Sequence, residues 1–128
     1  MVRMTLVESG VVIVVETRPE RRHTAQSMAD DVAAFQRLTG NQALPVLWDV
    51  RRMARPTPEG WRELVSRIPD AVAALAFLVD EESRTVPLSF PQVMNATLFP
   101  SRVFRDPGDA IAWAEQFVPD DFSRAHLE

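Results

Sequence analysis

The fold is decided by residues 44–50, which read Leu44-Pro45-Val46-Leu47-Trp48-Asp49-Val50. The run is apolar at nearly every position and closes on an acidic residue. This pattern is typical of a strand buried on both faces, as in a parallel sheet covered by helices. We therefore expect the stretch to be the centre of the sheet. It carries no catalytic motif, so the sequence indicates the architecture more strongly than the chemistry.

The composition predicts one cytoplasmic domain. A chain of 128 residues has room for a single core. It contains no cysteine, which excludes disulfides and thiolate chemistry and fits a reducing compartment. No signal peptide or membrane span is visible. The net charge of −4 argues against non-specific binding of nucleic acid, which needs surplus positive charge.

Upstream of the central run, the pattern predicts a hairpin and a crossover helix. Residues 3–8 and 11–17 are β-type segments separated by Ser9-Gly10, so they should pair antiparallel. The second is so rich in β-branched residues that we expect it inside the sheet. Residues 24–39 carry an apolar stripe at helical spacing. This helix should connect the strand at residues 11–17 to the central strand and make these two strands parallel.

Downstream, Thr57 and Pro58 have the pattern of a helix start, a hydroxyl cap followed by proline at the first helical position. We expect Pro69 to end this helix. Residues 73–79 are rich in alanine, but their place after a helix favours a buried strand.

The last third predicts a short helix, a strand and a final helix. The short helix should begin near residue 89 or 90, and the strand should cover residues 102–105. Asp106 and Pro107 then open the final helix as cap and first residue. Residues 1–118 are the expected domain, and residues 119–128 form a charged tail. The predicted fold class is α/β, a mixed sheet of about five strands with about four helices.

This order of elements resembles the STAS domain, the sulfate-transporter and anti-sigma-factor-antagonist fold, and especially its SpoIIAA-like branch. The resemblance covers about residues 4–118. It is carried by Val46-Leu47-Trp48-Asp49-Val50, which leads through an irregular loop to a helix, and by Val103-Phe104-Arg105-Asp106-Pro107-Gly108-Asp109-Ala110-Ile111-Ala112-Trp113. The resemblance implies a protein-binding regulatory domain.

The same resemblance directs attention to the start of the helix after the central strand. The antagonist family has an Asp-Ser-x-Gly motif there, whose serine is phosphorylated by a partner kinase. This chain has Thr57 in place of the aspartate, Pro58 in place of the serine, and Gly60 at the glycine. Proline cannot accept a phosphate, so the usual phospho-serine switch is not expected. Thr57 is either a shifted phospho-acceptor or a plain N-cap.

Arginines follow two neighbouring strands, at the carboxyl edge where open α/β sheets bind ligands. Around the Thr57 helix start they could hold a phosphate, a nucleotide or an acidic partner. The candidate binding residues are Arg18, Arg22, Arg51, Arg52 and Arg55, with Arg21 in the same cluster. In the alternative interpretation, Asp80, Glu81 and Glu82 neutralise these arginines. Asp49, at the strand end, is either a base or the acceptor that fixes the following loop.

Leu88, Phe90 and Met94 form the candidate apolar contact. They belong either to a partner or dimer surface, or to a lid over an apolar pocket, or they simply cover the sheet beside Phe99. His23 and His126 have no carboxylate at metal-ligand spacing, so we expect neither a metal nor a cofactor.

We therefore predict a non-enzymatic cytoplasmic regulatory or protein-binding module that lacks the usual phospho-serine switch. Its expected partner is a protein, either a different one or a second copy of the chain. A small ligand or nucleotide is the other option for the arginine edge. The alternative function is a carrier of a small apolar ligand or lipid, with its pocket near Phe90, Met94 and Phe99.

Overall fold

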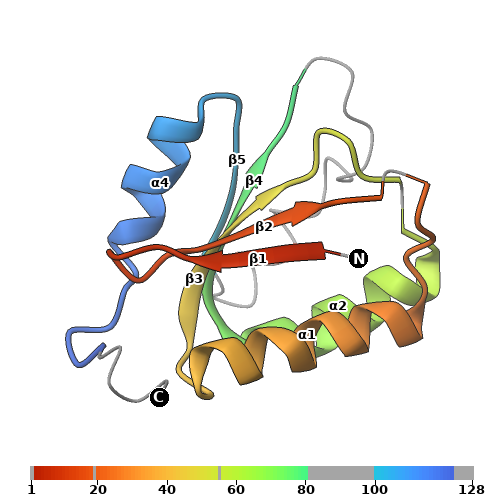
Figure 1. The fold of residues 1–128 in the computed structure, drawn as a ribbon, viewed down its shortest axis with the longest axis horizontal. Helices are drawn as coiled ribbons and strands as arrows, with labels where there is room; N and C mark the ends of the chain where they lie inside the picture. The colour runs from red at the N-terminus through yellow and green to blue at the C-terminus, as the bar shows by residue number, and fades with distance from the viewer. Residues whose placement is uncertain (1, 19, 55, 81–99, 123–128) are drawn as a thin grey trace.

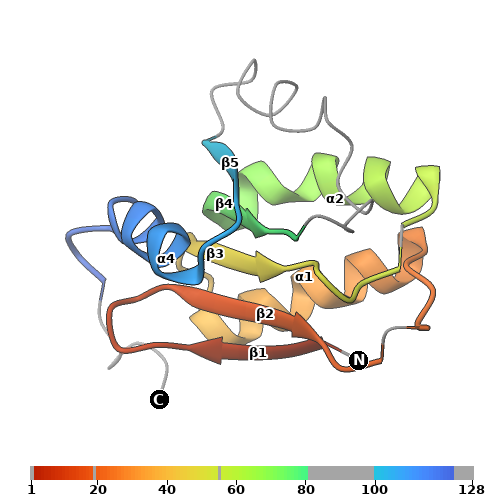
Figure 2. The same cartoon turned by 90° about the horizontal axis from the view of Figure 1, so that it is seen from above.

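The computed structural model describes residues 2–18, 20–54, 56–80 and 100–122. They form one five-stranded sheet with the order β1-β2-β3-β4-β5. Helices α1 and α2 cover one face and α4 covers the other (Figures 1 and 2). The elements are β1 (Val2–Leu6), β2 (Val12–Glu16), α1 (Ala25–Thr39), β3 (Leu44–Asp49), α2 (Pro58–Ala71), β4 (Val72–Leu78), β5 (Ser101–Phe104) and α4 (Pro107–Glu115). The predicted mixed α/β class is confirmed.

The first two strands form the predicted antiparallel hairpin. Its turn is closed by a hydrogen bond of 2.9 Å from the Val7 amide to the Val11 carbonyl. Gly10 has φ of +98°, a conformation that residues with a Cβ rarely adopt. A Cβ there would also lie 2.8 Å from the Val118 side chain, where the segment after α4 packs on the turn. Strand β2 lies between β1 and β3, so it is an interior strand as predicted.

Strand β3 is the centre of the sheet. It pairs parallel with β2 on one side and with β4 on the other, and β4 in turn pairs parallel with β5. Leu44, Val46 and Trp48 pack into the core on the α1/α2 side, while Leu47 packs into the core beneath α4. Burial on both faces explains why this strand is apolar at nearly every position.

The helix starts follow from local sequence. Thr24 caps α1, and Gly40 ends it with a left-handed φ of 60°. Thr57 and Pro58 open α2, and Asp106 caps α4. The described residues thus include three of the four helices expected. No helix in these ranges is long and apolar enough to cross a membrane.

The prediction that Pro69 ends α2 is wrong, because the helix continues to Ala71. A proline in the last turn removes only one backbone donor, and the Val72 amide still bonds to the Ile68 carbonyl. Strand β4 begins at Val72, with no residue between the two elements. The predicted strand at residues 73–79 is confirmed with this shift of one residue.

Several predicted features lie outside the described residues. They are the short helix near residues 89–97, the apolar contact Leu88, Phe90 and Met94, and the residues Arg55, Glu81, Glu82 and Phe99. Of the predicted tail, Phe122 is described, and it packs against the main core.

Candidate functional site

The carboxyl ends of β2, β3 and β4 meet at one edge of the sheet, because the three strands are parallel. A pocket of about 360 Å³ lies there. Among the described residues, its charged lining consists of three carboxylates and two guanidinium groups. The lining residues are Val15, Glu16, Asp49, Arg51, Arg52 and Asp80. The pocket is therefore of mixed charge and not uniformly basic.

Arg51 is already paired within this pocket. Its guanidinium donates to both carboxylate oxygens of Asp49, at 3.0 Å from Nε and 2.9 Å from Nη2. The Arg51 amide also donates to Asp49 at 3.1 Å, so the prediction that Asp49 fixes the following loop is confirmed. Burial would raise the pKa of Asp49, but the hydrogen bonds from Arg51 outweigh burial and hold that pKa below its usual value.

Arg52 is exposed, as is Arg51, and it is the second cation in the described lining of the pocket. Within the described ranges it makes no ion pair. Asp80 also lines the pocket and acts electrostatically on Arg51, which agrees in part with the interpretation that acidic residues neutralise these arginines. Arg52 is thus the described arginine of this edge best placed to meet a partner.

A second cluster of charges, partly buried, shares Glu16 with the pocket. The Glu16 side chain is 1% exposed, and one of its oxygens accepts a hydrogen bond of 3.1 Å from Arg21. The Arg21 guanidinium also donates to both carboxylate oxygens of Asp31 in α1, and the shortest of these contacts is 3.1 Å. Burial would raise the pKa of Glu16, but the Arg18 amide and Arg21 outweigh burial and lower the pKa. Arg21 therefore ties the end of β2 to α1.

His23 packs against this cluster and is fully buried. Its Nε2 lies 3.5 Å from Glu16, and neither ring nitrogen has a hydrogen-bond partner among the described residues. Burial lowers the pKa of His23, and Arg21 also acts to lower it, whereas Glu16 and Asp31 act to raise it. The imidazole is consequently neutral at pH 7.

The lowered pKa of His23 predicts acid-sensitive stability. The unfolded chain binds a proton at this histidine below about pH 6.5, whereas the folded chain resists that proton, so folding should weaken as the pH falls. Between pH 6.5 and 5, the free energy of unfolding should fall with pH less steeply in His23→Leu than in the wild type. The two slopes should differ by about 1 kcal/mol per pH unit. Urea titrations at several pH values measure this slope. Equal slopes in the two proteins would contradict the prediction.

Thr57 joins the two helix starts instead of facing the pocket. Its hydroxyl accepts from the Gly60 amide at 3.0 Å, as expected of an N-cap, and donates to the His23 carbonyl at 3.3 Å. The Thr57 amide donates to the same carbonyl at 3.0 Å. The beginning of α2 is therefore fastened to the loop that precedes α1.

Two other predicted arginines, Arg18 and Arg22, are described and are not among the residues that line the pocket. Arg18 is exposed, and its amide donates to Glu16 at 2.9 Å. Arg22 is also exposed, and its carbonyl lies 3.4 Å from the Ser27 hydroxyl that donates to it. The structure thus brings together Arg51 and Arg52 of the predicted set, and not Arg18 or Arg22.

A family model named Domain of unknown function (DUF7793) matches residues 5–118. The chain belongs to the DUF7793 family. No curated protein sequence matches it.

Two solved structures have a similar backbone to this DUF7793 domain. One is an uncharacterised protein of the DUF3478 family with a SpoIIAA-like fold from Shewanella loihica PV-4. It has a TM-score of 0.59 and 13% identity, over 89% of this chain and 92% of that one. The other is the anti-sigma factor antagonist SpoIIAA in its unphosphorylated form, with a TM-score of 0.54 and 13% identity, over 88% of this chain and 96% of that one. These similarities confirm the SpoIIAA-like fold.

The buried cluster of the DUF7793 domain was missed in the sequence. Glu16 continues the alternation of Val12 and Val14, which both face the core, so strand periodicity was the available signal for an inward carboxylate. His23 and Arg21 stand in a loop sequence without a pattern that predicts burial. Only the fold shows that this loop is covered.

Proposed function

We propose that this domain is a non-enzymatic, cytoplasmic protein-binding module of regulatory type, and that it meets its partner through the carboxyl-edge pocket around Arg52. The observation that carries the proposal is the mixed charge of the pocket, with exposed Arg52 beside Asp80 and the Arg51–Asp49 pair. Charges of both signs at fixed positions favour specific recognition of a complementary protein surface.

The same charges disfavour a phosphate or nucleotide at this site. Glu16, Asp49 and Asp80 contribute three carboxylates to the lining, and they outnumber the guanidinium groups of Arg51 and Arg52. Because Arg51 is held by Asp49, Arg52 is the guanidinium in the described part of the lining that has no ion pair with another described residue. With Glu16 paired to Arg21 and Asp49 paired to Arg51, a dianion would meet Arg52 and Asp80 together, whereas a protein surface can present an acidic group to the one and a basic group to the other.

In this proposal Thr57 acts as a structural cap. Both hydrogen-bonding capacities of its hydroxyl are used, towards Gly60 and towards the His23 carbonyl. A phosphate on this oxygen would remove the hydroxyl donor and break the bond to His23. Phosphorylation of Thr57 stays a prediction, and it would act by loosening the start of α2.

Charge reversal at Arg52 tests the proposal. Tagged wild type, Arg52→Glu and the control Arg37→Glu should be used to capture proteins from native lysate, with recovery quantified by mass spectrometry. Arg37 is also exposed but lies in the last turn of α1. We expect Arg52→Glu to lose a partner at least tenfold, about 1.4 kcal/mol of binding, and the control to retain it. A partner that is lost equally with both variants, or with neither, would count against this surface.

A further inference from the structure

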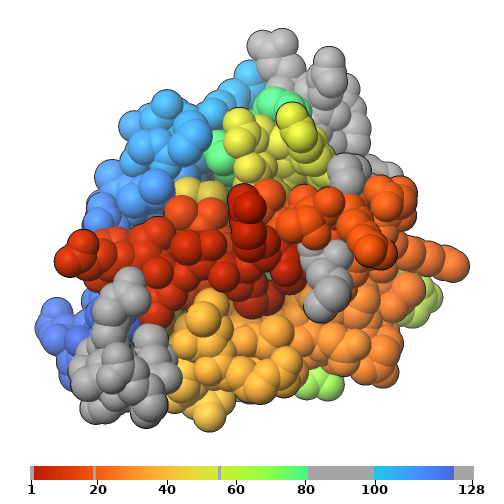
Figure 3. All heavy atoms as spheres, in the orientation of Figure 1, coloured from red at the N-terminus to blue at the C-terminus, as the bar shows by residue number. Residues whose placement is uncertain are grey.

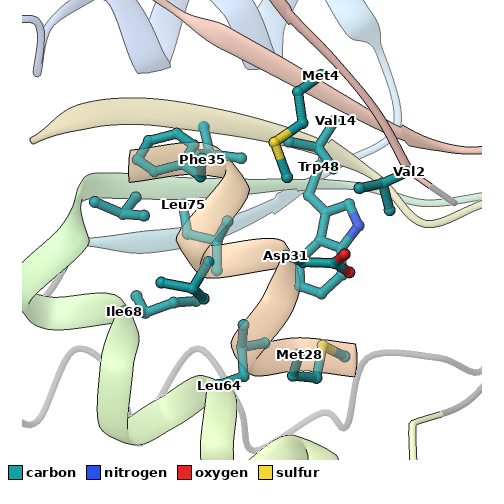
Figure 4. Close-up of a pocket in the computed structure, with 13 residues that line it drawn as sticks. Val2, Met4, Val14, Met28, Asp31, Phe35, Trp48, Leu64, Ile68 and Leu75 are labelled. Carbon is teal, nitrogen blue, oxygen red and sulfur yellow. The ribbon is translucent and has the colours of Figure 1, made fainter. Parts of the chain in front are cut away.

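A second pocket lies inside the fold, between the sheet and the layer of α1 and α2. It has a volume of about 60 Å³ and is lined by thirteen residues of the four strands β1 to β4 and the two helices (Figure 4). Eleven of these side chains are purely apolar, and the other two are Trp48 and Asp31. The chemistry of the pocket is therefore that of a hydrocarbon cavity with two polar groups.

The inner pocket leads to the surface beside β1. An outer groove of about 410 Å³ runs between β1 and α1, on the face where Figure 3 shows β1 above α1. Val2, Met4 and Asp31 line both the inner pocket and the outer groove. The two spaces share these walls, so a molecule in the groove can extend an apolar end into the core.

The two polar groups at the inner pocket are a hydrogen-bond donor, the Trp48 indole, and a hydrogen-bond acceptor, the Asp31 carboxylate. Trp48 is 94% buried, and its indole N–H has no hydrogen-bond partner among the described residues. A buried donor without a partner costs about 1–3 kcal/mol, so an acceptor from a ligand would stabilise it. Asp31 supplies a carboxylate, which retains acceptor capacity beside its contacts with Arg21. Figure 4 shows the indole nitrogen and the carboxyl oxygens turned to the same side of the pocket.

We propose that this pocket binds a small apolar molecule with a hydroxyl group, placed so that the hydroxyl oxygen accepts from the Trp48 indole and the hydroxyl proton is donated to Asp31. A hydroxyl is both donor and acceptor, so it meets both needs at once. The site is separate from the carboxyl-edge pocket, and it does not depend on the protein partner proposed above.

The charges at this site select a neutral head group. Asp30 and Asp31 line the outer groove together with Arg21 and Arg37, so its described charges balance. Asp31 is the charged residue in the described lining of the inner pocket, so a carboxylate head beside the indole would be repelled by it. An ammonium head would leave the Trp48 donor without an acceptor and would lie close to Arg21.

The volume limits the ligand to a short molecule. An apolar cavity of about 150 Å³ holds benzene, and one water occupies about 30 Å³. The inner pocket therefore takes only a few atoms, and the rest of the ligand must occupy the groove. This excludes a long acyl chain fully enclosed in the fold.

Titration with 1-butanol, followed by ¹H–¹⁵N NMR, tests the site. The indole signal of Trp48 is assigned by its absence in Trp48→Phe. We expect 1-butanol to shift this signal saturably, together with amides of β1 and α1. 1-Chlorobutane has the same number of heavy atoms but no hydroxyl. The wild type should bind 1-butanol more tightly than 1-chlorobutane. The ratio of the 1-chlorobutane dissociation constant to the 1-butanol dissociation constant should fall about tenfold in Trp48→Phe. Trp113→Phe, on the opposite face of the sheet, should leave the ratio unchanged.

A cavity-filling variant gives an independent measurement. Val14→Ile combined with Val32→Ile adds two methyl groups to the pocket lining, and it should abolish the butanol shifts while the melting temperature is kept. Shifts that do not saturate, which would indicate that the cavity holds water only, would overturn the proposal. An unchanged ratio in Trp48→Phe, or a preference for butanoate over butanol, would overturn it equally.

Discussion

Replacing Arg21 with methionine should lower the free energy of unfolding by about 3 kcal/mol at pH 7. Arg21 contacts both Glu16, whose side chain is 1% exposed, and Asp31. Methionine keeps much of the apolar stem but leaves both carboxylates without their cation. An unpaired carboxylate in a buried site is far more costly than the loss of a surface pair. Urea denaturation followed by circular dichroism measures the change.

The exposed pair of Arg62 and Glu59 in α2 offers a matched control. Its side chains are 74% and 64% exposed, so Arg62→Met should change the stability by no more than about 0.5 kcal/mol. A second test adds Glu16→Gln to Arg21→Met. The double variant should recover part of the loss, because the buried negative charge is gone. If Arg21→Met costs no more than Arg62→Met, the cluster does not stabilise the fold in the way described.

The two carboxylates of this cluster differ, because burial raises the pKa of Asp31 whereas hydrogen bonds from the Arg18 amide and Arg21 outweigh burial and lower that of Glu16. The pKa of Glu16 is lower in the folded chain than its ordinary value, so its contribution to stability is present above the ordinary pKa and is lost as the pH falls below it. The penalty of Arg21→Met should therefore shrink in acid, where the buried carboxylate can be neutralised by a proton.

Replacing Gly60 with alanine should destabilise the protein by about 2 kcal/mol, although alanine is the better helix former. A Cβ on Gly60 would lie 2.5 Å from the His23 carbonyl oxygen, well inside the contact distance. That oxygen belongs to the backbone and is held by the Thr57 amide at 3.0 Å, so it cannot move aside without loosening the start of α2. Thermal and urea unfolding of the variant measure the effect.

Gly108→Ala is the control for this substitution. Gly108 is also near the start of a helix, but it is exposed and the nearest atom to its added Cβ belongs to the Asp106 side chain, at 3.1 Å. A side chain can adjust, so the loss should be much smaller than at Gly60. Similar stabilities for the two alanine variants would show that the two helix starts are not packed as tightly as this geometry requires.

The parts of the fold that could be predicted are those set by short stretches of sequence. Burial of β3 follows from an apolar run, and the starts of α2 and α4 follow from a capping side chain and a proline. The end of α2 was wrongly predicted because proline was treated as a stop. In the last turn the surrounding packing, with Ile68 and Ala71 buried, outweighs the loss of one donor.

The candidate site was harder to predict because it depends on which side chains meet across the fold. The carboxyl edge was expected from parallel strands, and Arg51 and Arg52 do lie there. Nothing local to Asp49 or Arg51 showed that they would bind each other and remove one cation from the pocket. The inner pocket is less predictable still, because its walls come from four strands and two helices.

The direct passage from Ala71 to Val72 leaves the chain no slack between α2 and β4. A residue inserted at this point would reverse the side-chain alternation of β4 and turn Leu75 and Phe77 from the α1/α2 side to the α4 side, unless the helix gained the extra residue instead. Sequence length should consequently be far more constrained at this junction than in the loop between α1 and β3, where Asn41 and Ala43 are exposed.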